Sequence, residues 1–252
     1  MLNQLLKKLQ NLANPEQAEI AQRFFKTREG EYGEGDVFLG LTSQQTKDVA
    51  KKYYNLSLPK IKELLKSKIH EHRTCALRIL VHKYSKANEN ERENIFNFYL
   101  QNLKNINNWD LVDLSAPNIV GDFLFKRDTL KGTSKKILYK LVQSKNLWER
   151  RIAIISTFAF IKKGEFEDAL AISELLLNDT HDLIHKAVGW MLREVGKRDE
   201  EVLENFLKQH YKEMPRTMLR YSIERFEEEK RKRYLKGGFN YLTVTDFAKD
   251  LG

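Results

Sequence analysis

Similar helical segments recur along the chain at nearly constant intervals, and this repetition constrains the fold more than any other feature. The segments are HRTCALRILVHKY, WDLVDLSAPNIVGDFL, WERRIAIISTFAFIKK, IHKAVGWMLREVGK and PRTMLRYSIERF. Taking Ala76, Leu114, Ala153, Ala187 and Tyr221 as equivalent gives steps of 38, 39, 34 and 34 residues. Such a period suits units of two antiparallel helices, as in HEAT and armadillo repeats. It predicts an all-α fold, a curved solenoid of HEAT-like antiparallel helix pairs, over an ordinary helical bundle.

Proline and glycine placement supports helix over most of the chain. Only four prolines occur, and each can be read as opening a helix: Asn14-Pro15, Leu58-Pro59, Ala116-Pro117 and Met214-Pro215. Glycines crowd into EGEYGEGDVFLGL, so residues 29–40 are expected to form an ordered loop between two helices. The patterns that resemble strands, Val37 to Leu41 and Tyr241 to Val244, are too short and isolated to make a sheet.

Length and charge bound the organisation and the partner. The chain of 252 residues has no long polar linker, so a single repeat domain with a concave face is expected over residues 1–236, followed by a tail of unassigned role at 237–252. Lys and Arg total 44 against 35 Asp and Glu, a formal charge of +9. That excess favours a polyanionic partner such as nucleic acid. Long basic runs are missing, so phosphate contacts should come from side chains placed by the fold.

The compartment follows from cysteine usage and hydropathy. The single cysteine, Cys75, sits in the apolar run CALRILV and excludes an internal disulfide framework. The N-terminus alternates Leu with polar residues at helical spacing, unlike a secretory signal. No window has the uncharged length of a membrane span. We expect a soluble, cytoplasmic monomer.

Candidate chemistry lies in three successive repeats. The spacing of four places Trp109 and Asp113 one turn apart on one helix face, so that an aromatic ring and a carboxylate share a pocket. Apolar neighbours make that place unfavourable for a carboxylate unless it is paired or functional. An Asp held by an Arg, or one that caps a helix, is the alternative. Arg151 stands one repeat later, and Trp190 and Arg193 stand one repeat beyond that, where they would line the same surface.

These segments resemble a known family. WDLVDLSAPNIVGDFL, NLWERRIAI and KAVGWMLRE are similar to segments of the bacterial AlkD-type alkylpurine DNA glycosylases, helical-repeat enzymes of DNA alkylation repair. NPEQAEIAQRFFK and VFLGLT extend the likeness from about residue 10 to about residue 225.

The resemblance implies a role for each candidate residue. It makes Asp113 the catalytic carboxylate, Trp109 and Trp190 the aromatic pair around the sugar of the lesion, and Arg151 a phosphate contact. Arg193 matches a further basic position that faces the DNA. Phe24, which lacks a hydroxyl group, stands where the family often has a tyrosine. We expect it on the DNA-binding surface.

The predicted function is therefore excision of cationic N3- and N7-alkylated purines from double-stranded DNA by hydrolysis of the N-glycosidic bond, in base excision repair. The positive charge of such a base makes it a good leaving group, so one carboxylate suffices, and no cofactor is expected. The alternative is a non-catalytic HEAT-repeat scaffold that binds nucleic acid or protein.

Four other signals favour plain structural readings or stay open. His181 and His185 have the spacing of a helical zinc site, but no third ligand is apparent, so no metal is expected. Trp148 is interpreted as a core residue, and the mixed charge run 227–233 as a solvated helix face. The basic segment 125–136 is either a brace for a phosphate strand or a solvated loop.

Overall fold

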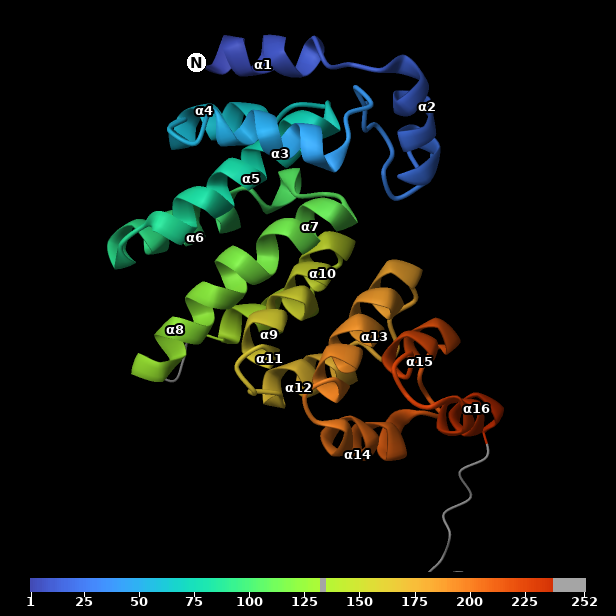
Figure 1. Ribbon diagram of the computed structural model, residues 1–252. Coiled ribbons are helices and arrows are strands. Elements are labelled where there is room, and N and C mark those ends of the chain that lie inside the picture. The colour runs from blue at the N-terminus through green and yellow to red at the C-terminus, as the bar shows by residue number, and fades with distance from the viewer. Residues whose placement is uncertain (132–134, 238–252) are drawn as a thin grey trace, which may run out of the picture. The chain divides into compact units, whose positions relative to one another are not determined.

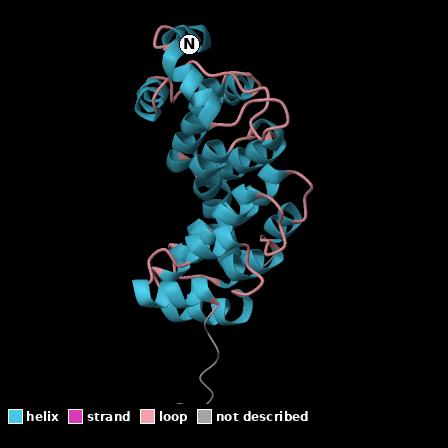
Figure 2. Ribbon diagram, turned by 90° about the vertical axis from the view of Figure 1, so that its right-hand side faces the viewer, coloured by secondary structure: helices cyan, strands magenta, loops and turns pink. Residues whose placement is uncertain are grey.

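The structure, a computed structural model, describes residues 1–131 and 135–237. Most of the predicted tail, the strand-like pattern at Tyr241 to Val244 and the middle of the basic segment 125–136 lie outside the described residues. Helices joined by loops and turns make up the described chain, and its β pairing is limited to one isolated bridge between Val37 and Ile69 (Figures 1 and 2). The predicted all-α class is confirmed.

The chain forms two compact units, divided between Phe160 and Ile161. The prediction of one continuous domain over residues 1–236, with one concave face, therefore stays a prediction. Among the described residues, no helix is both long enough and apolar enough to cross a membrane.

The first unit contains the following helices, with α11 running across the boundary: α1 (Leu2–Gln10), α2 (Pro15–Phe24), α3 (Ser43–Lys51), α4 (Leu58–Leu65), α5 (His70–Lys86), α6 (Glu89–Gln101), the 3₁₀ helix η1 (Leu103–Asn105), α7 (Trp109–Ala116), the π-helix η2 (Pro117–Gly121), α8 (Asp122–Lys131), α9 (Lys136–Val142), α10 (Leu147–Ser156) and α11 (Phe158–Ile161).

Helix pairs stack in sequence order within this unit. Helix α5 packs against α4, and α10 packs against α9, in each case across a short connection that makes the two helices antiparallel. Helices α5, α7 and α10 in turn pack one against the next. These three helices carry the equivalent positions Ala76, Leu114 and Ala153, so the predicted repeat is confirmed here as HEAT-like pairs. Ala76 and Ala153 are fully buried between the layers.

Pro117 corrects one expectation from the sequence. It follows α7 directly and opens a π-helical turn inside an unbroken helical path, instead of starting a helix after a loop. Proline lacks an N–H and crowds the carbonyl four residues earlier, here that of Asp113, and a π-turn relieves both problems. The Asn118 side chain helps by donating to the Leu114 carbonyl at 2.8 Å. The other three prolines lie at helix starts, as predicted: Pro15, Pro59 and Pro215.

The second unit contains α12 (Glu167–Leu175), α13 (Asp182–Gly196), α14 (Glu200–His210), α15 (Arg216–Ser222) and α16 (Glu228–Lys236). Helix α13 packs against α12, α14 and α15. The approach to α15 is close because a Cβ at Gly189 would lie 2.6 Å from the Met218 carbonyl oxygen. Glycine is therefore required at position 189. The run 227–233 is largely solvated, as predicted.

Candidate active site

Helix α7 begins at the proposed site. The Asn108 side chain accepts a hydrogen bond from the Trp109 N–H at 2.9 Å and so caps the helix at its first residue. Leu111 and Val112 are fully buried, whereas Trp109 and Asp113 are only partly buried. The apolar side of α7 thus faces the core, and the ring and the carboxylate lie one turn apart on the other side, as their spacing predicted.

Asp113 is held by a bidentate ion pair with Arg151 on α10. Arg151 Nε donates to Asp113 Oδ1 at 3.0 Å, and Nη2 donates to Oδ2 at 2.8 Å. The Arg151 side chain is only 5% exposed and that of Asp113 is 19% exposed. The alternative weighed from the sequence, an Asp held by an Arg, is therefore present at this very pair. A phosphate contact by Arg151 stays a prediction.

Burial and the charge of Arg151 have opposite effects on the pKa of Asp113. Burial raises the pKa of the Asp113 carboxyl, and the Arg151 guanidinium acts against that rise. The neighbouring Asp110 carboxylate, one turn earlier on α7, adds to it. Fork-to-fork pairing also fixes the plane of the carboxylate. Asp113 is an oriented carboxylate whose exposed part faces away from the core.

Aromatic rings surround Trp109. Phe25 stacks on the indole with the ring centroids 5.2 Å apart and the planes at 9°. Phe24 meets the indole edge-on at 5.9 Å and is 63% exposed, which is unusual for so large an apolar side chain. The indole is therefore supported on one face by Phe25 and flanked by an exposed ring.

The C-terminal end of α2 fixes these two phenylalanines. Its carbonyls are closed by the glycine-rich loop: the Tyr32 hydroxyl donates to the Phe24 carbonyl, and the Gly33 N–H donates to the Lys26 carbonyl at 2.9 Å. Lys26 has φ 55°, a left-handed conformation in which glycine is usual at a helix end. A Cβ at Gly33 would lie 2.4 Å from the Phe25 carbonyl oxygen, so the loop passes too close for any larger residue.

The loop over residues 29–40 is ordered, as predicted, and a buried carboxylate holds it. Glu71 on α5 is 3% exposed and accepts hydrogen bonds from the backbone N–H groups of Leu39, Gly40 and Leu41, at 2.8 to 3.2 Å. Gly40 has φ +84°, and a Cβ there would lie 2.2 Å from the Asn14 carbonyl oxygen. The loop is thereby tied to both α2 and α5.

Sequence reasoning missed a buried polar cluster next to Trp109, which we call the His70 cluster and define as Asp36, His70, Arg73, Asn108 and Asp110. His70 Nδ1 lies 3.2 Å from Asp36 Oδ2, and His70 Nε2 lies 2.8 Å from Asp110 Oδ2. Arg73 pairs with the other oxygen of Asp36 at 2.6 Å, and the Asn108 amide donates to Asp36 at 3.2 Å. A clue was present in the polar run His70-Glu71-His72-Arg73-Thr74 directly before the apolar CALRILV.

The surroundings of His70 favour a charged imidazole. Both ring nitrogens face carboxylate oxygens, an arrangement that favours a proton on each, and Arg73 Nη2 lies 3.4 Å from Nδ1 on the opposing side of the charge balance. Burial opposes the charge, but Asp110 and Asp36 outweigh burial and raise the pKa of His70 to about 9. Burial likewise raises the pKa of Asp36, but hydrogen bonding to His70 and the charge of Arg73 bring it below the ordinary value. Two carboxylates and two cations balance in the cluster.

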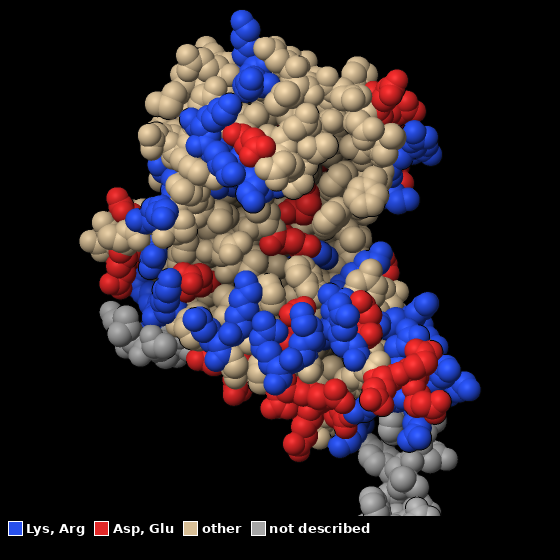
Figure 3. All heavy atoms as spheres, viewed as in Figure 1, with Lys and Arg blue, Asp and Glu red and all other residues tan. Residues whose placement is uncertain are grey.

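The remaining predicted site residues lie on α13 in the second unit. Trp190 is partly buried, and Arg193 forms an ion pair with Glu224. Figure 3 shows basic side chains gathered over α13 and α15, with acidic ones among them. Pairs on α13 such as Lys186 with Asp182 account for part of that mixture. The meeting of these residues with Asp113 stays a prediction.

The two histidines with zinc-like spacing form hydrogen bonds with the backbone at the start of α13. The His181 ring accepts a hydrogen bond from the Leu183 N–H, and His185 bonds to the Asp179 carbonyl. In the two described ranges, no group of three or more His, Cys, Asp or Glu could hold a metal ion. Trp148 is 8% exposed, and its interpretation as a core residue is confirmed.

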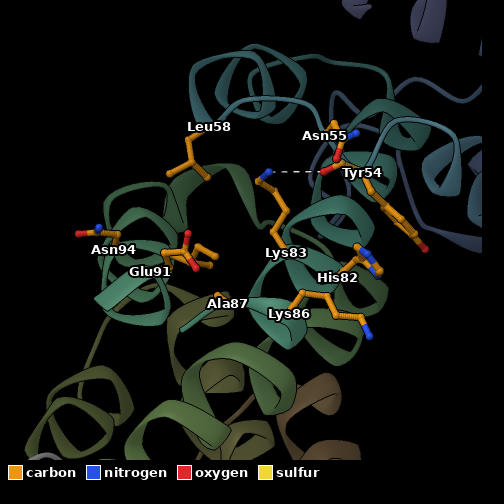
Figure 4. A pocket seen from close by; sticks show the side chains of 10 residues that line it. Tyr54, Asn55, Leu58, His82, Lys83, Lys86, Ala87, Glu91 and Asn94 are labelled. Atoms are coloured by element: carbon orange, nitrogen blue, oxygen red, sulfur yellow. Dashed lines mark hydrogen bonds between the residues drawn. The ribbon is translucent and has the colours of Figure 1, made fainter. Parts of the chain in front are cut away.

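A hollow lies away from these residues in the first unit, among α4, α5 and α6 (Figure 4). It has a volume of about 480 Å³ and includes Lys83, Lys86 and Glu91 in its wall. The Lys83 ammonium group donates to the Tyr54 carbonyl at 3.4 Å. None of the predicted site residues lines this hollow.

Comparison with known proteins decides the family. A family model described as DNA alkylation repair enzyme matches residues 5–226, which is most of the chain. The chain belongs to this family. The match agrees in extent with the resemblance seen in the sequence. No curated protein matches the chain.

The chain is also similar to solved structures. A predicted DNA alkylation repair enzyme from Enterococcus faecalis is 17% identical, with a TM-score of 0.64 over 86% of this chain and 97% of that one. AlkD2 from Streptococcus mutans is 18% identical, with a TM-score of 0.48 over 95% and 96% of the two chains. The protein smu.31 from Streptococcus mutans UA159 is 17% identical, with a TM-score of 0.48 over 96% and 99%. At such identity the first likeness shows the fold alone.

Proposed function

We propose that this member of the DNA alkylation repair family is a DNA glycosylase that excises cationic N3- and N7-alkylated purines. The observation that carries the proposal is a partly exposed carboxylate, Asp113, oriented by a buried Arg151 and placed one helical turn from the stacked Trp109. A scaffold that only binds phosphates has no use for a carboxylate on its binding face.

The reaction needs little beyond these groups. Alkylation at N3 or N7 gives the purine a positive charge, so the base leaves with the electron pair of the glycosidic bond and needs no acid. Positive charge then develops on the sugar. Asp113 stabilises that charge and accepts a hydrogen bond from the attacking water, and the proton of the water passes to the carboxylate or to solvent.

Arg151 and Trp109 assist in different ways. Arg151 favours the ionised form of Asp113 and fixes its plane, so the negative charge is in place before the bond breaks. The indole of Trp109 offers a π face to the cationic sugar, an attraction of about 0.5 to 2 kcal/mol. Trp190 is proposed as a second aromatic wall, with Phe24 and Arg193 as DNA contacts.

Base release tests the proposal directly. Duplex DNA treated with a methylating agent is incubated with the wild type or with Asp113→Asn, and released N3-methyladenine and N7-methylguanine are separated by chromatography. We expect release by the wild type and a loss of roughly a hundredfold or more in the variant, as for other preorganised electrostatic groups. Affinity for undamaged duplex should stay the same or rise slightly, because a negative charge near phosphates is gone. Equal rates for the two proteins would favour the non-catalytic scaffold.

A further inference from the structure

The His70 cluster is linked to Trp109 in three ways. Asn108, the residue before Trp109, donates to Asp36 and caps the Trp109 N–H. Asp110, the residue after it, receives the His70 Nε2 hydrogen bond at 2.8 Å. Phe25, which stacks on the indole, also packs against the His70 ring at 4.9 Å. The two residues beside Trp109 thus belong to the cluster, and the ring that stacks on the indole contacts His70.

Joining a loop to a helix through such a cluster carries a free-energy penalty, because charged groups must be desolvated. Its two ion-pair partners Asp36 and His70 are both 4% exposed in their side chains, and apolar residues would hold the same joint without desolvating charge. Phe38 covers the His70 ring at 4.6 Å, so water is kept from the imidazole on that side as well. We interpret the cluster as fixing the position of Trp109.

We infer that His70 is a positioning residue, which joins Asp36 of the glycine-rich loop to Asp110 of α7 and so holds the Trp109 indole where it meets the sugar. This inference rests on the proposed function. His70 does not touch the reacting atoms and acts through Trp109. His70 Nε2 also bonds to the Asp110 carboxylate, whose charge is one of the causes that raise the pKa of Asp113.

The test is His70→Gln, with His82→Gln as the matched control on the same helix. Single-turnover excision from methylated duplex should slow by about 2- to 30-fold in His70→Gln, and by no more than in Trp109→Ala, because His70 acts through that indole, while affinity for undamaged duplex changes less than about twofold. His82 lies outside the cluster, so its variant should match the wild type.

A double-variant cycle separates positioning from general loosening. If His70 acts through Trp109, adding His70→Gln to Trp109→Ala should slow excision no further. Additive losses would overturn the inference. Where His70→Gln does not fold, Asp110→Asn keeps the shape of the cluster and is measured in the same way.

A readout without activity keeps the two proposals distinct. With Trp148 and Trp190 changed to Phe, Trp109 is the only indole, and its emission is followed between pH 7 and pH 10. The charged groups facing His70 are Asp36, Asp110 and Arg73, and the pKa of the imidazole lies within that range. We expect a transition near pH 9 that disappears in His70→Gln. Trp109 emission that changes neither with pH nor with the His70→Gln substitution would overturn the inference. Failure of base release alone would overturn only the glycosylase proposal.

Discussion

Both oxygens of the Asp113 carboxylate accept hydrogen bonds from a single guanidinium, that of Arg151, which lies 38 residues further along the chain. The pair connects α7 to α10, two helices that pack as neighbouring repeats. One interaction therefore links two neighbouring repeats and orients the carboxylate.

Removing Arg151 should shift the acid side of the pH–rate profile. The active form of Asp113 is the carboxylate, so the rate falls as pH drops through its pKa, which burial raises and Arg151 holds down. Arg151→Gln should move this limb to higher pH and lower the plateau, whereas Arg151→Lys keeps a positive charge and should move it less. Rates of N7-methylguanine release from pH 4 to 9 give the profiles. Superimposable limbs in all three proteins would remove Asp113 as the titrating group.

The two proposed aromatic walls should matter more for rate than for binding. Trp109→Ala and Trp190→Ala should each slow excision by about 2- to 30-fold, the range set by a cation–π attraction that is strongest once the sugar is positive. Affinity for undamaged duplex should change little. Trp148→Phe, in the core, is the control and should leave the excision rate near that of the wild type. Equal losses of rate and affinity would make these tryptophans binding residues.

Binding should depend steeply on salt, and Glu224 should restrain it. If Arg193 exchanges its partner Glu224 for a phosphate, Glu224→Gln should tighten binding and steepen the dependence of log K on log salt. Arg193→Ala should weaken binding and reduce the slope by roughly 1. Fluorescence anisotropy with an undamaged duplex at 50 to 200 mM salt measures both. A slope indifferent to either substitution would take Arg193 out of the DNA contact.

Lys26→Gly should stabilise the fold. The left-handed backbone at Lys26 strains any residue with a Cβ, so glycine should raise the free energy of unfolding by up to about 1 kcal/mol. Arg28→Gly, in the same loop but without a positive φ, should leave that free energy unchanged or lower it, because glycine adds freedom to the unfolded chain. Urea unfolding compares the three proteins, and a less stable Lys26→Gly protein would contradict the strain argument.

How far the sequence reaches is clear from these residues. Trp109 and Asp113 could be placed together because helical spacing decides which residues share a face. The repeat period then predicted that Arg151 lies one layer away, but it could not say that the guanidinium turns inward to Asp113. That choice depends on side-chain packing between α7 and α10, which a spacing does not encode.

The His70 cluster shows why the rest was missed. Its members come from the loop, from α5 and from the start of α7, and Asn108 and Asp36 are 72 residues apart. Each member is of a polar or charged residue type that is usually found at the surface, and it becomes buried only when the three segments meet. The prediction at Pro117 was wrong for a different reason. Proline usually marks a helix start, but here a π-turn accommodates it within a continuing helix.

The stability of the protein should fall as pH rises from about 6.5 to about 9. The pKa of His70 is near 9 in the folded protein, above its unfolded value near 6.5, so its contribution is complete below pH 6.5 and is lost as pH rises through 9. The full loss corresponds to about 3 kcal/mol. The folded pKa of His72 is lowered by burial, so its effect falls below pH 6.5, outside this range. Burial raises the pKa of Cys75 to about 12, so Cys75 adds a decline above about pH 8.5 in both proteins. Urea midpoints at pH 6.5, 7.5 and 8.5 should therefore decline in the wild type and stay nearly level in His70→Gln. A decline of equal size in both proteins would place the titration elsewhere and would deny His70 its charge in the cluster.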